Sequence, residues 1–471
     1  ELVIPAQLER YRLAREGVIF TDASTPSPIC APARGAMFSG RYPPGCGMVT
    51  NWVPFTGDEV LAPEHLAGAG YTTALVGKLH FVPHRKRYGF MHHVLNDAPY
   101  SIYADDHKYS RYVEWLQQTL FKDDPDRAWQ VYDEDERAVF EGDHYKFFLG
   151  SNVVPEEYHM TAWTANESID FIEKHDAQRP FFLFSSFFGP HQPYDVPEPW
   201  RSVVDPESLE MPEPFDAEMQ GCPVFEATKK SQREKYRGQF SLEAYRRLIA
   251  SYLGNVAMID HYVGAIFETL ERRGLWENTT VIFTSDHGDH TGDWGLFGKG
   301  DMYETSVRVP LIVKPAAGSD IETGRRIERP VSTIDLYGTL CELGGVDGWR
   351  DEKTECGSLL GLLRGEAADE AATDVYSIIG ADADSNTTML RRGPLKMIRL
   401  ARPDGQALYE LHDLRMAPRE TTNVYAEPSY RTDRDAMKAD LDRWWAEQKA
   451  KYPGELRLFS KRAKKANGGK K

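Results

Sequence analysis

The chain has 471 residues, of which 56 are Lys or Arg and 72 are Asp or Glu, so its formal net charge is −16. The acidic balance argues against a nucleic-acid partner, because it would repel a phosphate backbone. A hydrophobic content of 41% argues against disorder as the main state. No apolar run approaches the roughly 20 residues that a bilayer requires, so we expect a soluble chain without a membrane partner.

Helical patterns alternate with short β-branched or aromatic runs through the first two thirds of the chain. The predicted helices cover residues 7–16, 62–69, 155–175 and 242–273, and the predicted strands cover 18–20, 71–76, 180–187, 279–285 and 308–313. Such alternation predicts a doubly wound α/β sheet. Ligands bind such sheets beyond the carboxyl ends of the strands, so polar clusters at those ends are candidate site residues.

The pattern changes after about residue 366. Short strands are predicted at 374–380, 387–392, 395–400 and 407–411, followed by a helix at 433–450 with Thr432 at its N-cap. We therefore expect a catalytic α/β domain at residues 1–365 and, at 366–471, a smaller antiparallel sheet with one helix and a basic tail. Residues 95–150 and 200–240 are predicted to be substrate-side loops.

Five cysteines occur at positions 30, 46, 222, 341 and 356. An odd, sparse set does not predict a disulfide framework, and no C-x-x-C pair is present to suggest structural zinc. One of them, Cys30, begins the pattern Cys30-x-Pro32-x-Arg34 within residues 28–41. Taken alone, Cys30 reads as a small buried residue at a helix start.

Four further segments follow in order. Three of them lie directly after predicted strands, and each alone has an ordinary explanation as a turn or a solvated loop. The segments are Gly77-Lys78-Leu79-His80, Gly189-Pro190-His191-Gln192-Pro193-Tyr194, Thr284-Ser285-Asp286-His287-Gly288-Asp289-His290, and Lys299 followed by Tyr303-Glu304.

Together these segments resemble the sulfatase family of the alkaline phosphatase superfamily, and the resemblance runs from about residue 3 to about residue 450. It extends to the ending Leu408-Tyr409-Glu410-Leu411, Pro418-Arg419-Glu420-Thr421 and Asn423. The resemblance implies a large, alkaline-phosphatase-like mixed sheet and the activity of a sulfuric ester hydrolase of arylsulfatase type. It also implies that a formylglycine-generating enzyme oxidises Cys30 to formylglycine.

Attack on a sulfate ester brings a nucleophile against negative charge, so the site must supply positive charge and a strong nucleophile. By resemblance, one hydroxyl of the formylglycine hydrate attacks sulfur and the second releases sulfate. The resemblance also assigns roles. Arg34 holds the hydrate and the metal geometry, Lys78 and Lys299 clamp the sulfate, His80 takes a proton, His191 serves the leaving oxygen, and Asp289 and His290 support the site.

The implied metal ligands are Asp286, His287 and residue 30, with Ca²⁺ as the expected ion and Mg²⁺ or Mn²⁺ left open. Many sulfatases have Asn at the position of His287, whereas Asp-His is frequent in phosphonate monoester and phosphodiester hydrolases of the superfamily. That class stays as the first alternative. The family's first strand ends in two Asp, and residues 1–29 hold no such pair, so we expect an N-terminally incomplete chain with a weakened metal site.

A second alternative is a catalytically inert relative that binds sulfate or glycans. An unrelated α/β hydrolase with an elbow serine as its nucleophile is disfavoured, because no G-x-S-x-G motif occurs. The expected substrate is a carbohydrate sulfate rather than a simple aryl sulfate. Its subsite could use aromatic and basic residues, namely Trp52, His84, Arg85, Lys86, Arg87, Tyr88, His92 and His93. The sequence predicts neither the oligomeric state nor the localisation.

Overall fold

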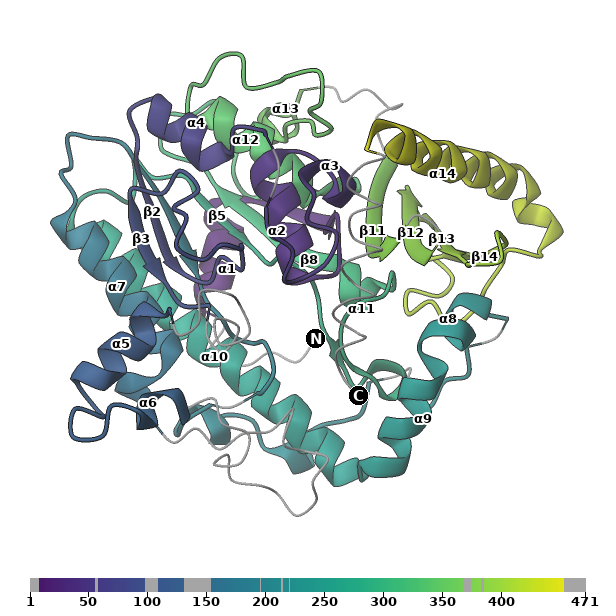
Figure 1. Ribbon diagram of the computed structural model, residues 1–471, viewed down its shortest axis with the longest axis horizontal. Coiled ribbons are helices and arrows are strands. Elements are labelled where there is room, and N and C mark those ends of the chain that lie inside the picture. The colour runs from purple at the N-terminus through teal and green to yellow at the C-terminus, as the bar shows by residue number, and fades with distance from the viewer. Residues whose placement is uncertain are drawn as a thin grey trace.

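The computed structural model describes residues 8–55, 58–97, 109–130, 154–194, 196–212, 215–219, 221–366, 374–382 and 385–452. Within these ranges, every helix is too short or too polar to cross a bilayer. The expected α/β architecture with a smaller antiparallel sheet and a helix is confirmed (Figure 1).

The larger, mixed sheet is divided into two parts. One part has the order β10-β1-β8-β5 with β9 also on β1, and β8 runs antiparallel to β1 and β5. The other is parallel, with the order β3-β2-β4. The bounds are β1 (Val18–Ser24), β2 (Thr72–Gly77), β3 (His92–Leu95), β4 (Phe181–Ser186), β5 (Val281–Thr284), β8 (Arg308–Lys314), β9 (Arg325–Ile327) and β10 (Val331–Ser332).

Helices cover both faces of this sheet. Along β8, Leu311 and Val313 join the cluster under one helical layer and Ile312 joins the other, because successive strand residues point to opposite faces. The first layer contains α2 (Cys30–Ser39), α3 (Pro43–Cys46), α4 (Ala62–Gly68), α12 (Leu336–Leu343) and α13 (Leu360–Arg364). The second contains α1 (Leu8–Glu16), α7 (Met160–Lys174) and α10 (Leu242–Arg272).

Strands β4 and β5 each have one edge without a strand partner among the described residues. Both strands contribute side chains to the same two clusters: Phe182 and Ile282 to one, Leu183 and Phe283 to the other. These apolar side chains are only half-buried, whereas the equivalent residues of β2 and β8 are mostly buried. The free edges of β4 and β5 therefore border the same interior.

The C-terminal unit is the antiparallel sheet β11-β12-β13-β14, with α14 packed on it (Figure 1). The strands are β11 (Asp374–Asp382), β12 (Ser385–Arg392), β13 (Leu395–Ala401) and β14 (Ala407–Asp413), and the helix is α14 (Arg431–Lys451). Met437 and Leu441 of α14 pack on Leu390 and Met397 of the sheet. The prediction of Thr432 as N-cap is wrong: Tyr430 is the N-cap, and Thr432 lies inside the first turn.

The segments predicted as loops contain helices where they are described. In the first, Ser110 caps α5 by accepting a hydrogen bond from the amide of Val113, and the apolar face of α5 is buried. The same segment continues in α6 (Arg127–Gln130), and the second contains α8 (Pro223–Thr228) and α9 (Lys230–Gln239); α5 covers Arg111–Gln118. The remaining short elements are β6 (His290–Thr291), β7 (Phe297–Gly298), α11 (Glu304–Val307) and the 3₁₀ turns at 156–158, 200–202, 206–208, 293–295, 333–335 and 428–430.

Candidate active site

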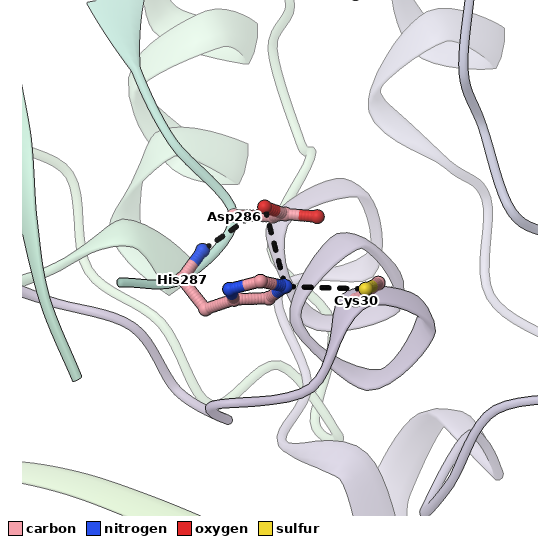
Figure 2. Close-up of side chains that lie close together, drawn as sticks. All are labelled: Cys30, Asp286 and His287. Carbon is pink, nitrogen blue, oxygen red and sulfur yellow. Dashed lines mark hydrogen bonds and ion pairs between the residues drawn. The ribbon is translucent and has the colours of Figure 1, made fainter. Parts of the chain in front are cut away.

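Cys30 is the first residue of α2 and is fully buried. The extended backbone of Ile29 ends there, so the unpaired N–H groups and positive dipole end of α2 lie beside the thiol. The amide of Ala31 donates a hydrogen bond to Oδ1 of Asn51 at 3.0 Å. Figure 2 shows Sγ of Cys30 pointing at Nε2 of His287, 3.1 Å away. The thiol therefore occupies a position where a helix favours negative charge.

Arg34 lies one turn further along α2, on the same face as Cys30. Its Nε donates to Oδ2 of Asp286 at 2.8 Å, and its Nη1 donates to the carbonyl of Lys78 at 2.8 Å and to Oγ of Ser186 at 2.9 Å. These acceptors follow or end β5, β2 and β4. Arg34 thus joins the carboxyl ends of three strands, which is the edge where the strand pattern predicted the site.

Positive charge converges on Cys30. Burial alone would raise the pKa of this thiol, but Lys78, Lys299 and His287 outweigh it and hold the pKa well below its ordinary value. Burial lowers the pKa of Lys78, against the opposing attraction of Cys30. Burial would likewise raise the pKa of the Asp286 carboxyl, but Arg34 and His287 hold it well below its usual range. The site is therefore arranged to accept an anion.

The loop that carries Lys299 is held by a buried ion-pair network. Lys229 donates to the carbonyl of Lys299 at 3.2 Å and pairs with Asp301 at 3.1 Å, and Asp301 also contacts Nε2 of His290 at 2.7 Å. Nζ of Lys299 itself is buried and has no hydrogen-bond partner among the described residues. Lys229 and Asp301 were not predicted, since they act on a loop backbone and belong to no recognisable pattern.

Both predicted catalytic histidines interact with Cys30, through a side-chain hydrogen bond and through charge. His191 donates from Nδ1 to the carbonyl of Gln192 at 2.5 Å, which leaves its Nε2 without a proton when the ring is neutral. Burial and Lys299 lower the pKa of His191 to about 3. His80 is fully buried, and burial lowers its pKa. Both rings are therefore neutral at neutral pH in this arrangement.

The predicted substrate-side residues differ in their exposure to solvent. Trp52 is 41% exposed, and its ring lies 5.3 Å from the ring of His80. His84, in contrast, is buried and bonds to Asp97, so it does not line an open subsite. Asp289, predicted as supporting, accepts a hydrogen bond from the hydroxyl of Tyr194 at 3.3 Å.

The donor atoms of the implied metal ligands decide whether the site fits a divalent cation. One ligand atom each from Cys30, Asp286 and His287 lies within 4.8 Å of the others. Ca²⁺ takes six to eight oxygen ligands, and this set offers one carboxylate that already accepts from Arg34. The described residues therefore do not by themselves fit a hard divalent cation.

A second group with metal-ligand residue types is formed by Cys222, Glu410 and His412. Oε1 of Glu410 accepts from the amides of Val224 and Phe225, at 2.6 and 3.1 Å. Its Oε2 accepts from the hydroxyl of Tyr303 at 2.9 Å. Its lone pairs are occupied, so this cluster joins α8 to the C-terminal sheet.

Two family models and several known proteins are similar to this chain. The family model described as Sulfatase matches residues 5–346, and the one described as N-sulphoglucosamine sulphohydrolase, C-terminal, matches residues 292–447. The chain is 28% identical over 444 residues to a choline-sulfatase of Rhizobium meliloti (91% of this chain, 80% of the relative). It is 31% identical over 352 residues to an arylsulfatase of Clostridium perfringens (71% and 69%). A phosphonate monoester hydrolase structure from Agrobacterium radiobacter superposes with a TM-score of 0.77 at 23% identity, covering 95% of this chain and 91% of that one.

Proposed function

This chain belongs to the sulfatase family of the alkaline phosphatase superfamily and is a sulfuric ester hydrolase, and we propose that residue 30 is its nucleophile. In this proposal, Cys30 is first converted to formylglycine. The observation that carries this proposal is the convergence of Lys78 and Lys299 on a buried Cys30 at the N-terminus of α2. In its hydrated form, formylglycine supplies a hydroxyl nucleophile that a thiol side chain lacks.

The chain's own residues bind and orient the ester. Lys78 and Lys299 offset the charge of the sulfate oxygens, and burial of their ammonium groups strengthens that attraction. The amide groups at the start of α2 add partial positive charge on the same side. Arg34 binds no substrate atom in this scheme; it holds Lys78 and Asp286 at fixed positions.

The two histidines handle protons. His80 is neutral and lies beside residue 30, so it is suited to accept the proton that the second hydroxyl of the hydrate gives up when sulfate leaves. His191 is neutral while the site is empty of anion, since burial and Lys299 hold its pKa at about 3. A bound sulfate offsets Lys299 and raises that pKa, which prepares His191 to donate a proton to the leaving oxygen.

A comparison of two chromogenic esters tests the proposal. The protein, produced with a formylglycine-generating enzyme, should hydrolyse p-nitrophenyl sulfate with a higher kcat/KM than a p-nitrophenyl phosphonate monoester. Lys299→Met should raise KM for the sulfate ester. Lys314→Met is the control, because Lys314 is a buried lysine that binds the carbonyls of Trp276 and Thr279 and none of the site residues. Equal loss in both variants would contradict the assigned role of Lys299.

Phosphonate monoester or phosphodiester hydrolysis is the second candidate. It is favoured by His287, whose Nε2 lies 3.1 Å from Sγ of Cys30 where many sulfatases have Asn. Faster turnover of the phosphonate in the same comparison would select it. An inert sulfate- or glycan-binding relative would instead bind sulfate and turn over neither ester.

We propose a carbohydrate sulfate as the substrate class. The match of residues 292–447 to a family described by its action on N-sulphoglucosamine supports a sugar. The exposed ring of Trp52 beside His80 offers a flat apolar surface to a sugar face. Glucosamine 6-sulfate and choline sulfate, compared with p-nitrophenyl sulfate, test this choice, and preference for choline sulfate would overturn it.

A further inference from the structure

A buried carboxylate lies beneath the turn that carries Lys78 and His80. Asp97 follows β3 and is inaccessible to solvent. Its Oδ1 accepts hydrogen bonds from the amides of Leu79 and His80, both at 2.9 Å, and its Oδ2 also lies 3.0 Å from the amide of His80. Two successive backbone N–H groups thus point at one carboxylate.

The backbone at His80 needs such support. Its φ is +66°, in the left-handed region that residues with a Cβ rarely adopt. Holding a non-glycine residue there costs about 1–2 kcal/mol, so the turn persists only where its surroundings enforce it. Successive amides in a turn of this kind form a concavity that binds an anion, and here the anion is the side chain of Asp97.

Asp97 is itself held in place. Nδ1 of His84 lies 3.0 Å from Oδ2 of Asp97, and both side chains are fully buried. Burial alone would raise the pKa of Asp97, but the hydrogen bond and charge of His84 hold it below its ordinary value. The carboxylate is therefore ionised and oriented, and both of its oxygens are engaged.

We propose that Asp97, oriented by His84, is a positioning residue that fixes the His80 ring against residue 30. The hydrogen bonds of Asp97 run to the 79–80 turn and to His84, so its effect on the His80 ring passes through the backbone of that turn. The proposal rests on the proton-accepting role assigned to His80 under the proposed function.

The test pairs Asp97→Asn with a matched control. Glu410 has the same arrangement elsewhere: it accepts from two successive amides, of Val224 and Phe225, and its Oε2 lies 3.1 Å from Nε2 of His412. Asp97→Asn should lower kcat about 10- to 100-fold with little change in KM, because a misplaced catalytic group costs that much. Glu410→Gln should destabilise the protein and leave kcat within about twofold.

Amide hydrogen exchange gives a readout that does not depend on turnover. Asp97→Asn should speed exchange at residues 79–80 and leave residues 224–225 unchanged, and Glu410→Gln should do the reverse. If Asp97→Asn fails to fold, His84→Gln tests the same clamp, with smaller losses of kcat and of protection at 79–80. If the wild-type chain turns over no ester, the proposed function fails while exchange still decides whether the clamp exists.

A double-mutant cycle separates positioning from general destabilisation. If Asp97 acts through His80, then Asp97→Asn should cost little further kcat in a His80→Ala background. Additive losses in that cycle, or a kcat for Asp97→Asn no lower than that for Glu410→Gln, would overturn the proposal. So would unchanged exchange at residues 79–80.

Discussion

Arg34→Lys should destabilise the fold by about 1–3 kcal/mol. A lysine ammonium can retain the pairing with Asp286, but it lacks the guanidinium fork that also reaches the Lys78 carbonyl and Ser186 Oγ. Each lost buried hydrogen bond is worth a net ~0.5–1.5 kcal/mol, and two are lost. Arg34→Ala should cost more, about 3–5 kcal/mol, because it leaves the buried Asp286 carboxylate uncompensated.

Urea unfolding at neutral pH measures these differences, with Arg41→Lys as the matched control. Arg41 is also buried and binds three partners, in its case the carboxylates of Asp58, Glu59 and Asp351, but none of these partners is a site residue. Both lysine variants should lose similar stability, and only Arg34→Lys should also lose kcat/KM, by about tenfold or more. An Arg34→Lys protein as stable as wild type would refute the claim that Arg34 ties the three strand ends together.

Lys299→Met should weaken inorganic sulfate binding about tenfold in calorimetry, because it removes one of the two ammonium groups whose charge acts on residue 30; unchanged sulfate affinity would count against the cationic pocket. Stability should fall as the pH drops from 6.5 towards 3, since the unfolded chain protonates His191 before the folded one, whose pKa is about 3. Urea unfolding at pH 7 and pH 4.5 should show a smaller loss in His191→Gln than in wild type, and equal losses would contradict this. Calcium should bind the 471 residues with a Kd no tighter than about 0.1 mM, because Cys30, Asp286 and His287 supply one carboxylate; tight, stoichiometric binding in a titration would refute it.

The strand pattern predicted that Lys78 and Asp286 lie close together at the carboxyl ends of strands. Lys78 and Asp286 come directly after runs that form β2 and β5, and the carboxyl ends of parallel strands meet at one edge of a sheet. The structure brings both to Arg34, as expected. The roles of the individual residues stay predictions, because geometry places them without showing the reaction.

Asp97 and Lys229 could not be predicted in the same way. Each acts on a backbone group of another segment, at residues 79–80 and 299 respectively, so neither belongs to a contiguous pattern. The strand before Asp97 has four residues and carries two histidines, too short and too polar to be recognised. Lys229 lies in a segment whose polar composition predicted a loop, although the segment forms α8 and α9 on either side of Lys229.

Glu420, in the C-terminal segment that resembles the sulfatase family, has a structural role. Oε2 of Glu420 accepts from the amide of Glu304 at 2.7 Å, where α11 begins. Lys396 pairs with both carboxylates, at 2.9 Å from Glu304 and 2.7 Å from Glu420. This buried trio ties the C-terminal sheet to the segment that follows Lys299, so the small unit helps to hold the loop that carries Lys299.

The expectation of a further strand ending in two aspartates remains a prediction. Strands β4 and β5, each with one edge unpaired in the described ranges, border the same two clusters, and Arg34 joins Ser186 at the end of β4 to Asp286 after β5. A strand placed between these edges would satisfy their backbone groups and cover their half-buried side chains.

The proposed activity depends on oxidation of residue 30 to an aldehyde in a positively charged pocket. Mass spectrometry of the peptide containing Cys30, after production with a formylglycine-generating enzyme and trapping with a hydrazide, tests it most directly. We expect an aldehyde at position 30 and none in a Cys30→Ala variant. An intact thiol at position 30 under those conditions would contradict it.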